Sequence, residues 1–172
     1  DALGYNHELE YPMLHTSDRQ SYQRLIFKAA ANDNYPFSNG GAHIRDSYVC
    51  ELSLIGDLHL DERKTLNCIV YINGQYWGVY EIREKVDDAD YTDYYFDQPA
   101  GNVDFLKTWG GTWEDYGAPN ALPDWNNLKN YIATNSMANP TNFNYVDSLL
   151  NWESLCDYFM INSYVVNQDW LN

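Results

Sequence analysis

The charged residues that follow a predicted β-hairpin are the first place in this sequence where chemistry could be concentrated. The run from Arg83 to Asp88 is Arg-Glu-Lys-Val-Asp-Asp, and it begins where an alternating apolar segment ends. We place a candidate site at this junction, with Glu84 and Lys85 at its centre. The alternative is a solvent-exposed ion-pair cluster of Arg83, Glu84 and Lys85, which would contribute little to stability.

The other residues that could bind metals or act as nucleophiles lack the spacing of a known site. An acidic run has neither the glycine nor the closing glutamate of an EF-hand, so a solvated acidic face is expected. This run comprises Asp87, Asp88, Asp90, Asp93 and Asp97. The four histidines show no metal-ligand spacing, and the three cysteines are expected to be small buried side chains. The sequence carries no serine-hydrolase, P-loop or cysteine–histidine nucleophile signature.

A hairpin, a preceding strand and several helices must position the candidate junction. Asn73-Gly74 tolerates positive φ at both turn positions, and alternating β-branched and aromatic residues flank it, which predicts a β-hairpin. Tyr22 to Ala31 fits a strand or a short helix, and the abrupt end at Asn32-Asp33-Asn34 and Tyr35-Pro36 favours the strand. His43 to Ile55 has helical spacing. The further elements expected are a helix over Ala89 to Asp97, a strand over Asn102 to Trp109, a loop over Gly110 to Leu122, and helices over Asp124 to Thr134, around Phe143 to Leu150 and over Trp152 to Val166. This order, with strands mainly in the first half, indicates an α+β fold.

Length and composition predict one folded domain in an acidic protein. The 172 residues are enough for a core, and 45% apolar with 16% aromatic residues exclude a disordered chain. The net charge of −15 repels phosphate backbones, which excludes a general nucleic-acid-binding role and favours cationic partners. No apolar run has the length of a membrane span, and no signal peptide is recognised. We expect a fragment of a longer protein that is secreted or lies at the cell surface.

Four segments in a fixed order carry a resemblance to a known family. The hairpin segment YINGQYWGVYEIREKVD resembles the signature strand pair of the CotH family, the spore-coat-protein-H-like kinases. LIFKAAANDNY is similar to that family's strand followed by Asn-Asp, and HIRDSYVCEL to its Arg-Asp helix. FMINSYVVNQDW is similar to its late helix, which ends in an Asn-x-Asp-Trp motif. The ordered set, from about Leu25 to the last residue, is more specific than any one segment.

The resemblance implies a single CotH-like domain over residues 1–172 with a partial protein-kinase-like fold. Residues 1–20 would be a loosely ordered tail, 21–86 a part with strand, helix and hairpin, and 87–172 a mainly helical part. Such a domain would bind ATP and magnesium and would transfer phosphate to hydroxyls of a protein substrate. The hairpin exit and the final acidic segment would then share one cleft.

The same resemblance implies roles for individual residues. Asp169 would orient the attacking hydroxyl or accept its proton, and the alternative is a solvated loop carboxylate. Glu84 and Lys85 would lie at the hinge, where backbone groups could pair with an adenine edge. Lys28 could reach phosphate as a strand-borne lysine. A solvated Lys28 is nevertheless the preferred interpretation, because the family's phosphate-binding lysine is expected in an upstream strand.

Two further positions match the family less directly. Arg45 and Asp46 match its Arg-Asp pair, and we expect them to brace the hairpin or the loop at Asp33, with a ligand role as the second interpretation. Asn172 is the candidate metal-binding residue, although it follows Asp169 at a shorter spacing than the equivalent asparagine of conventional kinases.

A different function remains as the alternative. The sequence lacks a glycine-rich phosphate strand at its start and a downstream metal-binding aspartate, so we expect this fragment to be inactive by itself. The alternative is a non-catalytic module of a secreted surface protein that binds carbohydrate or a partner protein. That module would be favoured if one open groove were lined by Trp109, Trp113 and Trp125. Burial of these three side chains would favour the kinase.

Overall fold

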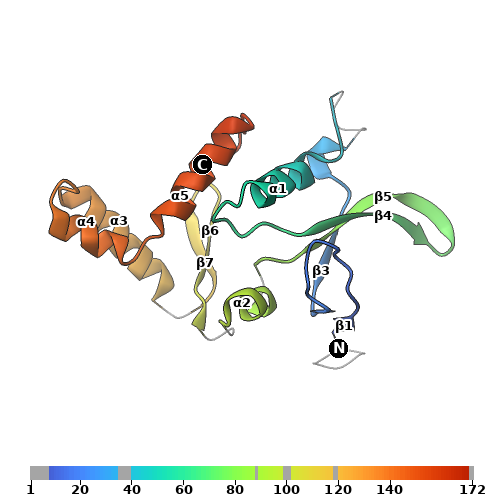
Figure 1. The fold of residues 1–172 in the computed structure, drawn as a ribbon, viewed down its shortest axis with the longest axis horizontal. Coiled ribbons are helices and arrows are strands. Elements are labelled where there is room, and N and C mark those ends of the chain that lie inside the picture. Colours follow the sequence, from blue (N-terminus) through green and yellow to red (C-terminus); the bar gives the residue numbers. More distant parts are fainter. Residues whose placement is uncertain (1–7, 35–39, 88, 99–101, 118–119, 171–172) are drawn as a thin grey trace. The chain divides into compact units, whose positions relative to one another are not determined.

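A computed structural model describes residues 8–34, 40–87, 89–98, 102–117 and 120–170 (Figure 1). Its backbone contacts divide the chain into two units. The first unit comprises residues 1–57 and 61–97, and the second comprises residues 58–60 and 98–172. Both helices and sheets are present, which confirms the α+β class. The single domain expected from the sequence stays a prediction, and each unit is described by itself.

A three-stranded antiparallel sheet is the centre of the first unit. Its strands are β3 (Leu25–Lys28), β4 (Thr65–Ile72) and β5 (Gln75–Glu84), in the order β3-β5-β4. Strands β4 and β5 form the predicted hairpin, and Asn73 and Gly74 take φ values of 51° and 78° at its turn. A twisted two-residue turn of this kind requires positive φ at both positions, which Asn-Gly tolerates at little cost. The sequence therefore predicts the two strands and their turn, whereas the register shift between Val70 and Tyr71 departs from the regular alternation expected.

Strand β3 is much shorter than the strand it pairs with. It pairs with residues 81–84 of β5 alone, and Lys28 lies opposite Glu81. The chain then leaves the sheet through Ala30 and Ala31, whose φ values are 58° and 46°, into a short 3-10 helix, Ala31–Asp33. Left-handed conformations at two successive alanines end the strand abruptly. As a result, within the part of the chain that the structure describes, the first half of β5 pairs only with β4.

Helices α1 (Arg45–Ile55) and α2 (Ala89–Phe96) complete the regular structure of the first unit, and both agree with the sequence prediction. The residue before α1, Ile44, forms no capping hydrogen bond with its side chain. Asp33 takes over this role, because its carboxylate accepts hydrogen bonds from the backbone N–H groups of Ala42 at 2.8 Å and Arg45 at 3.1 Å. The Asn-Asp segment after β3 thereby fixes where α1 begins.

The segment before β3 is packed, which differs from the loosely ordered tail expected over residues 1–20. Strands β1 (Leu9–Glu10) and β2 (Ser21–Tyr22) pair with each other, and the side chains of Leu14, Arg19 and Tyr22 are buried. The tail was expected because this segment has no apolar periodicity. Its burial depends instead on single residues and on partners far along the chain. Residues 1–7 lie outside the described part.

The second unit contains a β-hairpin and three helices. Strands β6 (Phe105–Thr108) and β7 (Thr112–Tyr116) pair in antiparallel register. The helices are α3 (Ala121–Thr134), α4 (Pro140–Asp147) and α5 (Trp152–Tyr164). The loop expected over residues 110–122 is wrong, because β7 and the first residues of α3 lie within it. Gly110, with φ of 64°, forms the turn that allows Thr112 and the residues after it to pair with β6.

Three contacts hold helices α4 and α5 of this unit. Asn139 and Asn151 cap α4 and α5, because their side-chain oxygens accept backbone N–H groups at 2.9 and 3.0 Å. His59, from the 58–60 stretch, donates its backbone N–H to Asp157 at 2.8 Å and places its ring Nδ1 2.9 Å from the same carboxylate. Cys156 is exposed, contrary to the expected burial of the cysteines. Within the described ranges, no helix has the length and apolar character that crossing a membrane requires.

Candidate functional site

The exit of β5 carries two charged side chains that point to opposite faces of the sheet. Arg83 and Glu84 are successive strand residues, so their side chains alternate. Both are buried, and Glu84 is 0% exposed. The surface ion-pair cluster considered from the sequence is therefore wrong. These charges lie in the interior of the first unit, where an unpaired charge would be costly.

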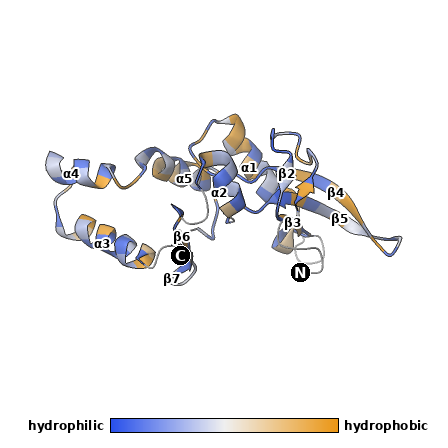
Figure 2. Cartoon of the chain, turned by 90° about the horizontal axis from the view of Figure 1, so that it is seen from below, coloured by the Kyte–Doolittle hydropathy of each residue, from blue (hydrophilic) through white to orange (hydrophobic). Residues whose placement is uncertain are grey.

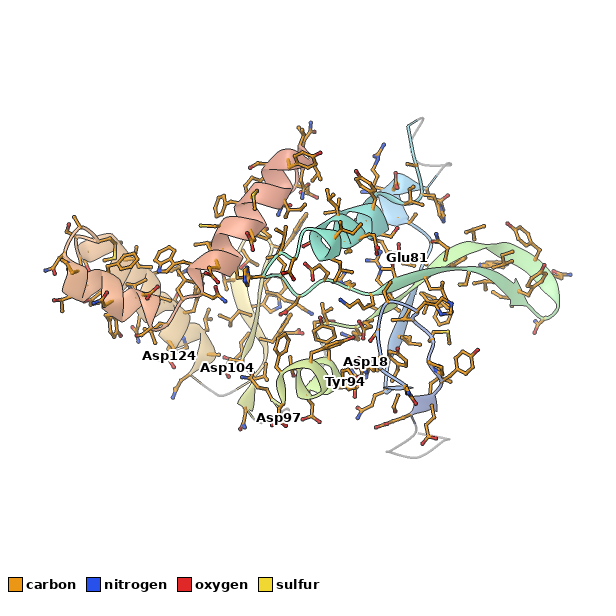
Figure 3. The ribbon with its side chains drawn as sticks, in the orientation of Figure 1. Asp18, Glu81, Tyr94, Asp97, Asp104 and Asp124 are labelled. Carbon is orange, nitrogen blue, oxygen red and sulfur yellow. The ribbon has the colours of Figure 1, made fainter. Side chains whose placement is uncertain are left out.

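On the face toward α1, Arg83 joins a four-residue ion-pair network. Its guanidinium pairs with Glu81 on the same strand and reaches Asp46 of α1 with both terminal nitrogens at 3.3 Å. Asp46 also pairs with Lys28 of β3. Burial tends to raise the pKa of Asp46, but the hydrogen bond and charge of Lys28, together with Arg83, lower it overall. Glu81 is labelled on this part of β5 in Figure 3.

Lys28 is consequently paired with an acidic residue of the following helix, and the solvated lysine preferred from the sequence stays a prediction. Strand alternation places Lys28 and Glu81, which lie opposite each other, on the α1 face of the sheet. The side chain of Lys28 retains 29% exposure. Its ammonium group is therefore fixed in direction while still accessible to a ligand.

On the other face, Glu84 lies in a buried network with the segment before β3 and with α2. Arg19 places a guanidinium nitrogen 3.5 Å from its Oε1, and the hydroxyl of Tyr95 donates to the same oxygen at 3.0 Å. Arg19 also pairs with Asp90 of α2. The second carboxylate oxygen of Glu84 has no hydrogen-bond partner among the described residues, and burial raises the pKa of this carboxyl above its usual value. The nearby pair of Asp18 and Tyr94, at 2.9 Å, is labelled in Figure 3.

The two remaining candidates of this unit have local partners. Lys85 pairs with Asp87 at 2.6 Å, directly after β5. The Nε of Arg45 lies 3.2 Å from the carboxylate of Asp33. Although burial acts to raise it, the pKa of Asp33 is lowered by the N–H groups of Ala42 and Arg45 and by the Arg45 charge. These contacts match the bracing role expected for Arg45 and Asp46.

Asp169 lies in a short segment that folds back onto α5. Val166, with φ of 53°, turns the chain out of the helix. The side chain of Asn167 then donates to Asn162 at 2.8 Å and accepts the backbone N–H of Asp169 at 3.0 Å. The ring of Trp170 packs edge-on against Phe159 of α5, with 5.1 Å between centroids. The carboxylate of Asp169 is exposed between these two anchors.

The metal-binding prediction has no support in the described part of the chain. There, no group of three or more histidine, cysteine, aspartate or glutamate side chains could hold a metal ion. Asn172, the residue predicted to bind metal, lies outside the described residues. The first unit contains Lys28, Arg45, Glu84 and Lys85, and the second unit contains Asp169. The cleft they were expected to share stays a prediction.

A comparison with protein families assigns the chain. The family model described as "CotH kinase protein" matches residues 6–172. The chain belongs to the CotH family. Neither the curated proteins nor the solved structures contain a match to it.

Several structural residues of this CotH chain were not found from its sequence. Asp46 was expected to brace the hairpin or the loop at Asp33, with a ligand role as the second interpretation, but its pairing with Lys28 was not anticipated. Arg19 was overlooked because its partners Glu84 and Asp90 are far away in sequence. The alternation of β5 was a usable signal, since it places Arg83 and Glu84 on opposite faces and so excludes a single surface cluster.

Proposed function

We propose that this CotH-family chain carries a protein-kinase-like phosphotransferase site that uses ATP and a protein hydroxyl. The support is the ion pair between Lys28 of β3 and Asp46 of the helix that follows it. In protein kinases a strand lysine binds the nucleotide phosphates and is held by an acidic residue of the next helix. In protein kinases this acidic residue is a glutamate, and under the proposal Asp46 takes its place in this chain.

The order of elements supports the same proposal. A lysine-bearing strand is followed by a helix, by a hairpin whose second strand is central in the sheet, and by a charged exit into another helix. Later, a long helix leads into the segment that presents Asp169. Glu84 is fully buried and its backbone N–H donates to Lys64 at 3.3 Å, so under the proposal the backbone at Lys85 lies along the adenine, and the buried Glu84–Arg19 pair keeps that connection rigid.

The proposed chemistry assigns separate tasks to two side chains. Lys28 would compensate the negative charge of the phosphate chain, for which its accessible ammonium group is suited. Asp169 would accept the proton of the acceptor hydroxyl as the oxygen bonds to the γ-phosphorus and the bond to ADP breaks. ATP supplies the phosphoryl group when bound. Because the described residues offer no cluster of metal ligands, we derive no step through magnesium.

Two matched pairs of variants test these tasks in the full-length protein. Lys28→Met removes the phosphate-binding charge, and Lys107→Met is its control, since Lys107 is also strand-borne, paired with an aspartate at 2.8 Å, and 35% exposed. Asp169→Asn removes the proposed proton acceptor. Asp147→Asn, at an exposed carboxylate at the end of α4, is the control for it. ATP affinity is measured by calorimetry and transfer by incorporation of labelled γ-phosphate.

The two experimental variants should have different effects. Lys28→Met should weaken ATP binding by about ten- to hundredfold, as expected for a charge-assisted contact. Asp169→Asn should leave ATP binding nearly unchanged and reduce transfer by about a hundredfold or more. Equal effects in the experimental and control variants, or ATP binding that does not depend on Lys28, would contradict the proposal.

The exposure of three tryptophans favours a second candidate, the non-catalytic binding module. Trp109, Trp113 and Trp125 of the second unit are all exposed, and that they line one open groove stays a prediction. A titration with soluble oligosaccharides, followed by tryptophan fluorescence, tests it. Binding that is lost in Trp109→Ala and Trp113→Ala, combined with no ATP binding, would favour the module over the kinase.

A further inference from the structure

The β4–β5 hairpin carries charge on its α1 face only where its side chains contact α1. The sequence from Leu66 to Tyr80 contains no charged residue, and apolar colour follows parts of the hairpin in Figure 2. Glu81 and Arg83 then follow on the α1 face of β5, and they are 4% and 3% exposed. Two buried charges at the end of an uncharged ribbon require an explanation, because burying a charge is costly.

Stability alone does not explain this ion pair. Apolar residues in place of a buried ion pair are often neutral or stabilising, so an apolar interior would serve the fold equally well. What the pair does supply is a cation that is fixed in direction. Glu81 accepts the Nε–H of Arg83 and also contacts one of its terminal nitrogens. Both terminal nitrogens lie 3.3 Å from the carboxylate of Asp46.

Asp46 is the residue that this cation holds. Its side chain is 56% exposed, so packing alone does not fix the direction of its carboxylate. One oxygen, Oδ2, contacts both the guanidinium of Arg83 and the ammonium group of Lys28. Charge-assisted contacts of this kind are strong and directional, so the carboxylate that Arg83 holds can in turn orient Lys28. Arg83 is too deeply buried to meet a ligand itself, and its effect on Lys28 passes through Asp46.

We propose that Arg83, fixed by Glu81, is a positioning residue that holds Asp46 and thereby orients the ammonium group of Lys28 before a nucleotide binds. The benefit for ATP binding rests on the proposed function, whereas the orientation of Lys28 does not. Arg83 also keeps Asp46 paired when Lys28 turns toward phosphate, so the carboxylate is not left without a cation. Binding of ATP then requires less ordering of the lysine side chain.

A double variant that removes this anchor without leaving a buried charge tests the proposal in the full-length protein. Glu81→Met together with Arg83→Met replaces both buried ions by apolar side chains. Lys107→Met together with Asp115→Met is the matched control, because it removes another strand-borne ion pair, at 2.8 Å, in the second unit. Arg83→Lys is an additional variant in case the double variant does not fold. It keeps the buried charge but offers Asp46 one ammonium group in place of two guanidinium nitrogens.

Nuclear magnetic resonance relaxation of the lysine ammonium groups, measured without nucleotide, gives the first readout. The Lys28 ammonium group should be ordered in the original protein and in the control, less ordered in Arg83→Lys, and most mobile in the double variant. A loss of stability alone would not produce this order, because the double variant keeps an interior without an unpaired ion. Equal order of Lys28 in the original protein and in the Arg83 variants would overturn the proposal.

Calorimetric titration with ATP gives the second readout. The double variant should weaken ATP binding by about three- to tenfold, which is less than the effect of Lys28→Met, because the ammonium group is still present but must be ordered on binding. The control should bind ATP as the original protein does. In an Asp46→Asn background the same double change should have little further effect, because the connection from Arg83 to Lys28 is already broken.

The two readouts separate this inference from the proposed function. A loss of ATP affinity that is equally large with Asp46 and with Asn at that position would show that Arg83 does not act through Asp46, which contradicts the inference. If the original protein does not bind ATP, the proposed function fails. The order of the Lys28 ammonium group, which is measured without nucleotide, then still decides whether Arg83 positions it.

Discussion

The network on the α1 face of the sheet yields the most quantitative prediction. Arg83 and Glu81 are 3% and 4% exposed, and their charges face each other in the interior. Arg83→Met removes the cation and keeps an apolar chain of similar length. Glu81 then remains as a buried carboxylate without its main partner. The double variant with Glu81→Met removes both charges and restores an interior without an unpaired ion.

The two variants differ in their expected cost. Removing one member of a buried ion pair typically costs about 3–5 kcal/mol, because the remaining charge stays desolvated. Replacing both members by apolar residues is often neutral or stabilising. With a urea m-value of about 2 kcal/mol/M, Arg83→Met should lower the unfolding midpoint by about 1.5–2.5 M. The double variant should recover most of this loss, and it should fold even if Arg83→Met alone does not.

Urea unfolding followed by far-ultraviolet circular dichroism measures both midpoints. Hydrogen exchange at the amides of residues 81–84 assigns the effect to the first unit. A double variant as unstable as Arg83→Met, or a single variant within about 1 kcal/mol of the original protein, would show that the pair is not buried as described.

Three further predictions concern titration and capping. Burial raises the pKa of Glu84, so its favourable contribution to folding stability is complete below about pH 4.5 and is lost as the pH rises through the pKa of the folded state. Glu84→Gln should therefore become more stable relative to the original protein from pH 4.5 upward, and a difference in urea midpoint that does not change with pH would refute this. The backbone N–H and the ring of His59 lower the pKa of Asp157, so its contribution to stability is complete above about pH 4 and is lost as the pH falls through the lowered value. His59→Ala removes the ring but keeps the backbone N–H, so it should reduce that loss in acid unfolding of the second unit, and an unchanged profile would argue against the ring contact. Asp33→Ala should cost about 1–2 kcal/mol and increase hydrogen exchange at Arg45, whereas an unchanged exchange rate would exclude Asp33 as the cap of α1.

The local parts of the fold could be predicted from sequence, because their determinants are adjacent residues. Asn73-Gly74 specifies the hairpin turn, and the spacing of apolar residues predicts α1, α3 and α5. The strand β7 was missed because its flanking glycines indicate a loop, whereas its pairing with β6 depends on residues earlier in the chain. Turns and periodicity are thus predictable where one short segment contains the whole signal, whereas the register shift between Val70 and Tyr71 was not.

The candidate site was only partly predictable, because its contacts connect distant segments. Lys28 was recognised as a strand lysine, but its pairing with Asp46 depends on how α1 lies against the sheet. Burial of Glu84 depends on Arg19 and Tyr95, which lie before and after the hairpin in sequence. No periodicity within one segment contains this information. Residue identity suggested the chemistry, and the tertiary contacts define the partners.

The central claim is that the ammonium group of Lys28 faces the phosphates of a bound nucleotide. An acyl-phosphate derivative of ATP, which acylates lysines beside the bound phosphate chain, measures this directly when the labelled peptides are identified by mass spectrometry. The account predicts that Lys28 is labelled preferentially, that excess ATP prevents the labelling, and that Lys107 is labelled weakly and without ATP protection. Labelling spread equally over both lysines, or labelling of Lys28 that ATP does not reduce, would contradict it.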